Sequence, residues 1–112
     1  MATPPEEFSI SATERDGQLL VTLRGELDLA TAPDLEDLLE GRIAAGQEVV
    51  VDLRGLQFMD SSGIRVLIAG HARAERAGTR LLIVRPADEH PVAKIIEVSG
   101  LDGELHLIDA PA

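Results

Sequence analysis

Residues 49–64 read Val-Val-Val-Asp-Leu-Arg-Gly-Leu-Gln-Phe-Met-Asp-Ser-Ser-Gly-Ile, and they carry the clearest strand-to-helix signal in the chain. The apolar run over 49–53 predicts a strand that is buried on both faces. A helix is expected to begin near Asp60, because Asp and Ser are common N-cap residues. This helix would end at Gly78 and turn one apolar face inward, consisting of Ile64, Leu67, Ile68 and Ala72.

Upstream of this stretch, the pattern is that of a β-hairpin. Phe8, Ile10 and Ala12 alternate with polar residues, which predicts a half-buried strand. The Asp-Gly pair within residues 14–17 supplies the positive φ that a tight hairpin turn requires. A second strand is predicted over residues 19–23, ending at Gly25.

Strands and helices alternate from there on. Thr31, Pro33 and Asp34 predict a capping box at the start of a helix that Gly46 ends, with Leu35, Leu38, Leu39 and Ile43 at helical spacing. Residues 81–84 predict another buried strand. Asp88 is the expected cap of a third helix, which turns Val92, Ile95 and Ile96 inward and is followed by Gly100. Residues 105–108 predict a short last strand.

These elements predict an α/β fold, with one domain built on a mixed β-sheet of four to five strands and helices packed against it. The length of 112 residues suits a single domain with its own core. We expect the domain to span residues 8–109, with a flexible N-terminal tail over 1–7 and a C-terminal tail over 110–112.

Composition excludes several classes of function. The net charge of −10 repels phosphate backbones and anionic lipid, and Phe8 and Phe58 are the only aromatic residues. We therefore expect no nucleic-acid and no membrane partner. The chain has no cysteine, its N-terminus has no secretory signal pattern, and its apolar runs are too short to cross a bilayer. A cytoplasmic protein that is monomeric when free is the expectation.

The most informative polar residues are Ser61 and Ser62. They follow a buried strand and open a helix, where free backbone amides favour an anion. A phosphate on such a serine would gain amide hydrogen bonds. Ordinary helix capping by Asp60 or Ser61 explains the same residues. Capping needs only one side chain, however, and leaves the second serine and Gly63 unexplained.

Enzymatic chemistry has little support in the sequence. No Gly-x-x-x-x-Gly-Lys loop, glycine-rich dinucleotide fingerprint or Gly-x-Ser-x-Gly elbow is present. His71 is predicted to be a partly buried structural residue, and His90 and His106 to be surface residues. Asp28, Asp52 and Asp60 could meet at strand ends, but a solvated acidic face is favoured over a metal site. We expect no catalytic residue, cofactor or metal, and we expect Asp28 to lie beside the Asp60–Ser61 corner.

Four segments together resemble a STAS domain, and specifically the bacterial anti-sigma factor antagonists. These segments are Gly25-Glu26-Leu27-Asp28, residues 49–53 with 58–63, Gly78-Thr79-Arg80-Leu81, and Val98-Ser99-Gly100-Leu101. The resemblance spans roughly residues 8–108. It departs from the family at Arg65, where many members carry Gly, and at Ile64, where Leu is common.

The resemblance implies a role in partner switching during transcription regulation and stress response. Such an antagonist, when unphosphorylated, binds an anti-sigma factor that is a serine kinase and so releases a sigma factor. The kinase phosphorylates the serine that matches Ser61, rather than Ser62, and a serine phosphatase resets the switch. The residues expected to bind the partner are Asp28, Leu29, Thr31, Asp60, Ser61, Ser62, Gly63, Ile64 and Arg65.

Two other functions stay open. The domain could be a STAS scaffold or ligand-binding module of another assembly, of the stressosome or lipid-transport type. An enzyme acting through Ser61 is the third, although the scattered histidines leave that serine without an evident base. The intact sequence over residues 60–63 favours the phosphorylation switch.

Overall fold

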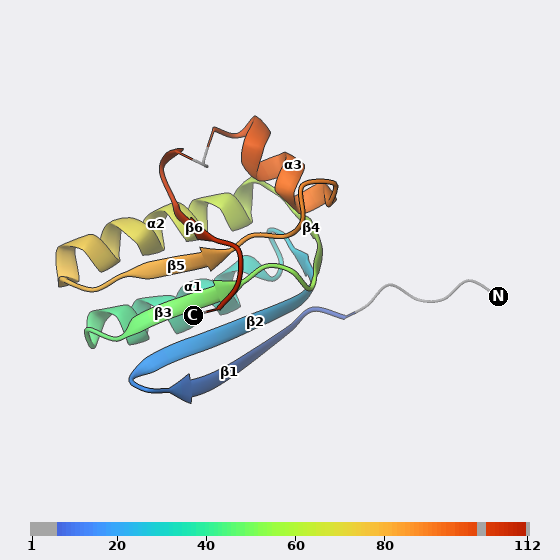
Figure 1. The fold of residues 1–112 in the computed structure, drawn as a ribbon. Coiled ribbons are helices and arrows are strands. Elements are labelled where there is room, and N and C mark those ends of the chain that lie inside the picture. The colour runs from blue at the N-terminus through green and yellow to red at the C-terminus, as the bar shows by residue number, and fades with distance from the viewer. Residues whose placement is uncertain (1–6, 101–102, 112) are drawn as a thin grey trace.

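The computed structural model describes residues 7–100 and 103–111. Residues 1–6 of the predicted N-terminal tail, Leu101 of the family-like segment and residue 112 lie outside these described residues. The described chain folds as an α/β domain with a mixed sheet, as predicted (Figure 1). Its elements are β1 (Ser9–Arg15), β2 (Gln18–Leu27), α1 (Ala32–Ala44), β3 (Glu48–Asp52), β4 (Leu56–Met59), α2 (Ser61–Ala77), β5 (Leu81–Val84), α3 (Pro91–Val98) and β6 (His106–Ile108).

The sheet has the strand order β1-β2-β3-β5-β6, with β4 paired to β2 alone. Only β1 and β2 are antiparallel, and the other pairs are parallel. Besides pairing with β1, strand β2 is long enough to serve two parallel partners, because Gln18–Thr22 pair with β3 and Gly25–Leu27 pair with β4. The described residues thus form six strands, whereas four to five were predicted. The strand that the sequence analysis missed is β4, whose four residues are too few to show an alternation.

The hairpin between β1 and β2 forms as predicted. Asp16 and Gly17 both have positive φ, 52° and 80°, as a two-residue hairpin turn requires. Strand β1 lies at the edge of the sheet, where Phe8 and Ile10 are half-buried but Ala12 is exposed. The prediction that Ala12 is half-buried was therefore wrong, because β1 has a partner strand on one side only.

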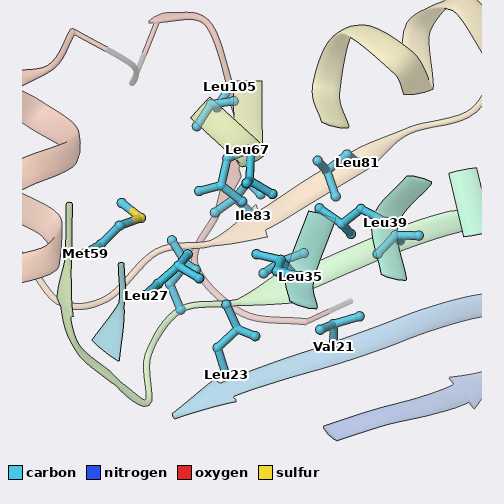
Figure 2. Close-up of a cluster of buried hydrophobic side chains, with 14 of the residues drawn as sticks. Val21, Leu23, Leu27, Leu35, Leu39, Met59, Leu67, Leu81, Ile83 and Leu105 are labelled. Carbon is cyan, nitrogen blue, oxygen red and sulfur yellow. The ribbon is translucent and has the colours of Figure 1, made fainter. Parts of the chain in front are cut away.

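Helices α1 and α2 run side by side along one face of the sheet, and the main core lies between them and the strands (Figure 1). Figure 2 shows side chains from β2, β4, β5 and both helices converging there. The largest fully buried members of this core include Leu19, Leu23, Leu27, Leu35, Leu39, Ile43, Leu53, Leu56, Met59, Leu67, Leu81 and Ile83. Burial of this many large apolar side chains is the main stabilising term of the fold.

The buried face of α2 differs from the predicted one. It consists of Gly63, Val66, Leu67, Gly70 and Ala74, whereas Ile68 is 37% exposed and Ile64 and Ala72 are half-buried. The cause is the close approach of the helix to the sheet. A Cβ on Gly70 would lie 2.8 Å from Leu81 Cδ2, so small residues rather than large ones face the strands.

Two predicted caps also differ. Thr31 is the N-cap residue of α1, but its side chain makes no capping hydrogen bond. Helix α3 begins after His90 rather than Asp88, and His90 Nδ1 accepts a hydrogen bond from the Val92 amide at 3.0 Å. His90 is thus a half-buried cap and not the surface residue predicted. Pro91, which suits the first position of a helix, fixes the start there.

Asp52 holds the turn between β3 and β4. Its buried carboxylate accepts hydrogen bonds from the Arg54 amide at 3.0 Å and from the Arg54 guanidinium at 2.8–3.2 Å. Burial raises the pKa of the Asp52 carboxyl, but the hydrogen bonds and charge of Arg54 outweigh burial and leave this pKa below its usual value. The turn that leads into β4 therefore depends on an ionised Asp52.

We predict that Asp52→Asn lowers the free energy of unfolding by about 1 kcal/mol at pH 7, since it removes a charge-assisted pair whose arginine is partly solvated. A carboxyl with a depressed pKa stabilises the fold above its unfolded pKa of about 3.9 and stops doing so as the pH falls through its folded pKa. The difference between the variant and the unsubstituted protein should therefore shrink below about pH 4. Urea unfolding between pH 2.5 and 7 measures it. A difference that stays constant across this range would contradict the assignment.

Candidate functional site

The candidate site lies where α2 begins, beside the carboxyl ends of β2 and β4 (Figure 1). Leu27 on β2 is paired with Met59 on β4. The Asp60 amide continues this pairing by donating a hydrogen bond to the Leu27 carbonyl at 3.1 Å. Asp28 and Asp60 therefore follow directly on two neighbouring strand ends, so that Asp28 lies beside the Asp60–Ser61 corner as expected.

Asp60 is the residue that caps α2. Its Oδ1 accepts a hydrogen bond from the Ser62 amide at 2.8 Å, and its carbonyl accepts one from the Ile64 amide at 3.2 Å. Ser61 is exposed, and in the part of the chain that the structure describes its hydroxyl has no hydrogen bond. Ser62 is half-buried. Asp60 thus provides the side-chain cap without either serine hydroxyl, and the Ser61 hydroxyl is open to solvent.

Gly63 fixes how closely α2 approaches the two strand ends. A Cβ at this position would lie 2.7 Å from Met59 Cγ and 2.8 Å from Leu27 Cδ2 and Cγ. Leu27 and Met59 are fully buried and lie next to each other in the core (Figure 2). The small residue after the two serines therefore has a packing role, because it lets the first turn of α2 rest directly on the β2–β4 pair.

The loop between β2 and α1 borders the site and is held by its own side chains. The Thr31 hydroxyl accepts a hydrogen bond from the Asp28 amide at 2.9 Å and donates one to the Glu26 carbonyl at 2.8 Å. Asp28 Oδ1 accepts from the amides of Ala30 and Thr31 at 3.0 and 3.1 Å. These bonds explain why Thr31 does not cap α1: its hydroxyl is already engaged within the loop.

A shallow groove with an exposed leucine at its edge lies beside the first turns of α2. Leu29, at the tip of the β2–α1 loop, is 78% exposed, and Phe58 on β4 is 42% exposed. A groove of about 180 Å³ lies between this loop, α1 and α2, lined by Leu29, Ala32, Pro33, Glu36, Ser62, Arg65 and Val66. The sequence analysis did not assign Phe58, Glu36 or Val66 to the site. No local pattern marks Glu36 and Val66, since their place in the groove arises from the packing of α1 beside α2.

The other polar residues considered in the sequence lie elsewhere. Asp52 is bound to Arg54, and among the described residues no group of three or more His, Asp or Glu side chains is arranged to hold a metal ion. His71 is half-buried, as predicted, and its Nε2 lies 3.0 Å from Glu75 Oε1. It is ten residues beyond Ser61 on the same helix, a rise of about 15 Å. His71 is therefore too far away to act as a base on Ser61.

Among the described residues, no helix combines the length and the apolar character that a bilayer-spanning segment requires.

Comparison with known proteins places these features in a family. The profile of the family described as "Mlab, STAS domain" matches residues 10–109. An anti-sigma F factor antagonist of Paenibacillus polymyxa is 34% identical over 98 residues, which is 84% of this chain and 80% of that protein. An anti-sigma-B factor antagonist of Staphylococcus aureus is 27% identical over 101 residues, covering 89% of this chain and 92% of that protein.

Solved structures show the same fold. An anti-sigma factor antagonist from Mycobacterium paratuberculosis is 26% identical with a TM-score of 0.77, covering 97% of this chain and 92% of that one. SpoIIAA superposes in its unphosphorylated form with a TM-score of 0.71 at 20% identity, covering 94% of this chain and 90% of that one. The murine anion transporter Slc26a9 also contains the fold, with a TM-score of 0.70 at 19% identity, but the match covers 88% of this chain and only 17% of the transporter.

We predict that Gly63→Ala lowers the free energy of unfolding by about 1 kcal/mol, the difference between an overlap cost of about 2 kcal/mol and a propensity gain of about 1 kcal/mol. The overlap arises because the added methyl group meets the buried side chains of Leu27 and Met59. Gly41→Ala is the matched control, because Gly41 lies within α1 and a Cβ there would meet no atom within 4 Å. It should stabilise the protein by about 0.5–1 kcal/mol. Urea unfolding of the two variants measures both effects, and equal stabilisation by both would contradict the packing role of Gly63.

Proposed function

The chain belongs to the STAS domain family, and on this premise we propose that it is an anti-sigma factor antagonist that phosphorylation of Ser61 switches off. The observation that carries this proposal is the state of the Ser61 hydroxyl. It is exposed at the first turn of α2, and Asp60 already provides the cap. The named function of the P. polymyxa and S. aureus relatives supports the antagonist role.

The proposed partner is an anti-sigma factor with serine-kinase activity. Unphosphorylated, the protein binds this kinase and so frees a sigma factor for transcription. The kinase transfers a phosphate to Ser61 and the complex dissociates, after which a serine phosphatase restores the unmodified form. SpoIIAA, which shares the fold, has been solved in an unphosphorylated and in a phosphorylated form.

We further propose that the free protein is a monomer and acts in the cytoplasm, where sigma factors meet RNA polymerase.

The surface that meets the kinase is proposed to centre on Ser61. The groove that Leu29, Ser62 and Arg65 line adjoins this serine, and Phe58, three residues before it in the chain, is a further exposed apolar side chain. The remaining residues expected to bind the partner act through shape. Gly63 is buried against the strands, Ile64 is half-buried, and Asp28, Thr31 and Asp60 hold the local backbone through the hydrogen bonds described above.

Charge explains how one phosphate can break such an interface. The phosphate adds about −1.5 to −2 charges at pH 7, next to Asp60 and close to Asp28, on a protein of net charge −10. Burying an unpaired charge in an interface costs several kcal/mol, and every ~1.4 kcal/mol lowers affinity about tenfold. A loss of about three orders of magnitude therefore requires no change of fold.

The alternative is a scaffold or ligand-binding module within another assembly, of the stressosome or lipid-transport type. The description of the matching family and the occurrence of the fold within an anion transporter support this alternative. The exposed, uncommitted Ser61 favours the phosphorylation switch, because a purely structural module does not require a free hydroxyl at this corner.

We predict that Ser61→Asp weakens binding to the kinase about a hundredfold, because a single added charge is buried against a surface complementary to a neutral hydroxyl. Ser61→Ala should bind as tightly as the unmodified protein and stay bound in the presence of ATP. The kinase can be captured from a lysate of the source bacterium with Ser61→Ala as bait and then purified. Titration calorimetry with this kinase measures the affinities.

Melting curves provide the control for this prediction. A carboxylate at a helix N-terminus gains roughly 0.3–1 kcal/mol, which offsets its repulsion from Asp60, so Ser61→Asp should melt within about 3 °C of the unsubstituted protein. If Ser61→Asp binds the kinase normally, the electrostatic switch is wrong. If it unfolds instead, Ser61 has a structural role.

We also predict that the kinase modifies Ser61 and not Ser62. Ser61 is exposed, whereas Ser62 is half-buried and lines the groove, so its hydroxyl is less accessible to an active site. Peptide mapping by mass spectrometry after incubation with kinase, ATP and Mg²⁺ measures the occupancy of each serine. The test uses the unsubstituted chain, since removal of Ser61 could redirect the kinase. Most of the phosphate on Ser62 would refute the assignment.

A further inference from the structure

We propose that Arg65 binds the phosphate on Ser61 within the same molecule, across one turn of α2, and that phosphorylation thereby makes the Arg65 cation unavailable to the partner. This inference rests on the proposed modification of Ser61 and adds a second step to it.

The helix places the two side chains on one face. Ser61 and Arg65 are four residues apart in α2, and both are exposed. Residues at this spacing have Cβ atoms about 5–6 Å apart, and an anion that precedes a cation by four residues is the favourable order. Long side chains on a helix lean toward its N-terminus. A guanidinium at position 65 is therefore within reach of a phosphate on Ser61.

Arg65 is available for this contact. In the described residues it has no ion pair and no hydrogen bond, whereas five other arginines are each paired with a carboxylate, namely Arg42, Arg54, Arg73, Arg80 and Arg85. The segments that build the site, residues 25–41 and 55–64, contain no Lys or Arg. Arg65 is thus the cation that the first turns of α2 offer to a phosphate on Ser61.

Three carboxylates near the site could compete with the phosphate on Ser61 for Arg65. Glu36 of α1 lines the same groove, Asp28 lies in the neighbouring loop, and Asp60 precedes Ser61. Asp28 and Asp60 already accept backbone hydrogen bonds through Oδ1, and none of the three forms an ion pair with Arg65. A phosphate carries up to twice the charge of a carboxylate and three acceptor oxygens, which suit the two-pronged guanidinium. The phosphate should therefore outcompete these carboxylates.

The pairing has a consequence for the switch. Before modification, Arg65 borders the groove beside Leu29 as a free cation, available to an acidic group of the partner. After modification, the same guanidinium is held over Ser61. Phosphorylation then adds negative charge to the docking surface and at the same time occupies the cation that could otherwise pair with an acidic group of the partner.

The test uses phosphoserine incorporated at position 61 during translation, so that it does not depend on any kinase. The readout is the pH midpoint of the second phosphate ionisation, followed by ³¹P NMR. A neighbouring cation lowers this midpoint, so Arg65→Gln should raise it by about 0.3 pH units. The midpoint of Arg65→Lys should lie between that of Arg65→Gln and that of the unsubstituted protein. The control is Arg76→Gln, which removes the same charge from an exposed position in the last turn of α2 and should move the midpoint by less than about 0.1 pH units.

A midpoint that Arg65→Gln leaves unchanged, or that Arg76→Gln shifts equally, would overturn the proposal. The result is separable from the proposed function. Failure of the kinase to modify Ser61 would refute the switch and leave the titration as it is, whereas an unchanged titration in a protein that the kinase does modify would refute the role of Arg65 alone.

Discussion

The contact between Gly63 and the side chains of Leu27 and Met59 is the constraint on which the candidate site depends. Leu27 ends β2 and Met59 ends β4, and both are fully buried. Because Gly63 has no side chain, the first turn of α2 can rest on this pair. The same approach recurs two turns later at Gly70, which faces Leu81 and Leu39. α2 is thereby held close to the sheet along its length, and Ser61 lies at a fixed place above the strand ends.

Structural and chemical roles are divided among neighbouring residues at this corner. Asp60 satisfies the helix terminus through the Ser62 amide, and Asp28 and Thr31 satisfy the adjoining loop. Once these polar groups are paired, the Ser61 hydroxyl and the Arg65 guanidinium are left exposed and uncommitted in the described part of the chain. A modification of Ser61 can therefore alter the surface charge without removing a bond that holds the fold. This is the physical basis for a switch that acts on binding rather than on stability.

The sequence predicts those parts of the molecule whose signal is local. The Asp16-Gly17 turn and the Asp60 cap of α2 follow from turn and cap chemistry, and both are present. The inward face of α2 was not predictable from hydrophobic spacing, because glycines make its closest contacts and Ile68 turns outward. The capping role of Thr31 was lost to the Glu26 carbonyl, a partner that only the folded loop supplies. The groove residues Glu36 and Val66 come from two helices, so that only tertiary packing brings them to the site.

The central claim is that a phosphate on Ser61 separates the protein from its kinase partner through charge. The most direct measurement is the affinity of the purified kinase for the phosphorylated and the unphosphorylated protein, determined by calorimetry at several salt concentrations. The account predicts an affinity at least about a thousandfold lower for the phosphorylated form, with a difference that narrows as salt screens the charges. Equal affinities of the two forms at low ionic strength would contradict it.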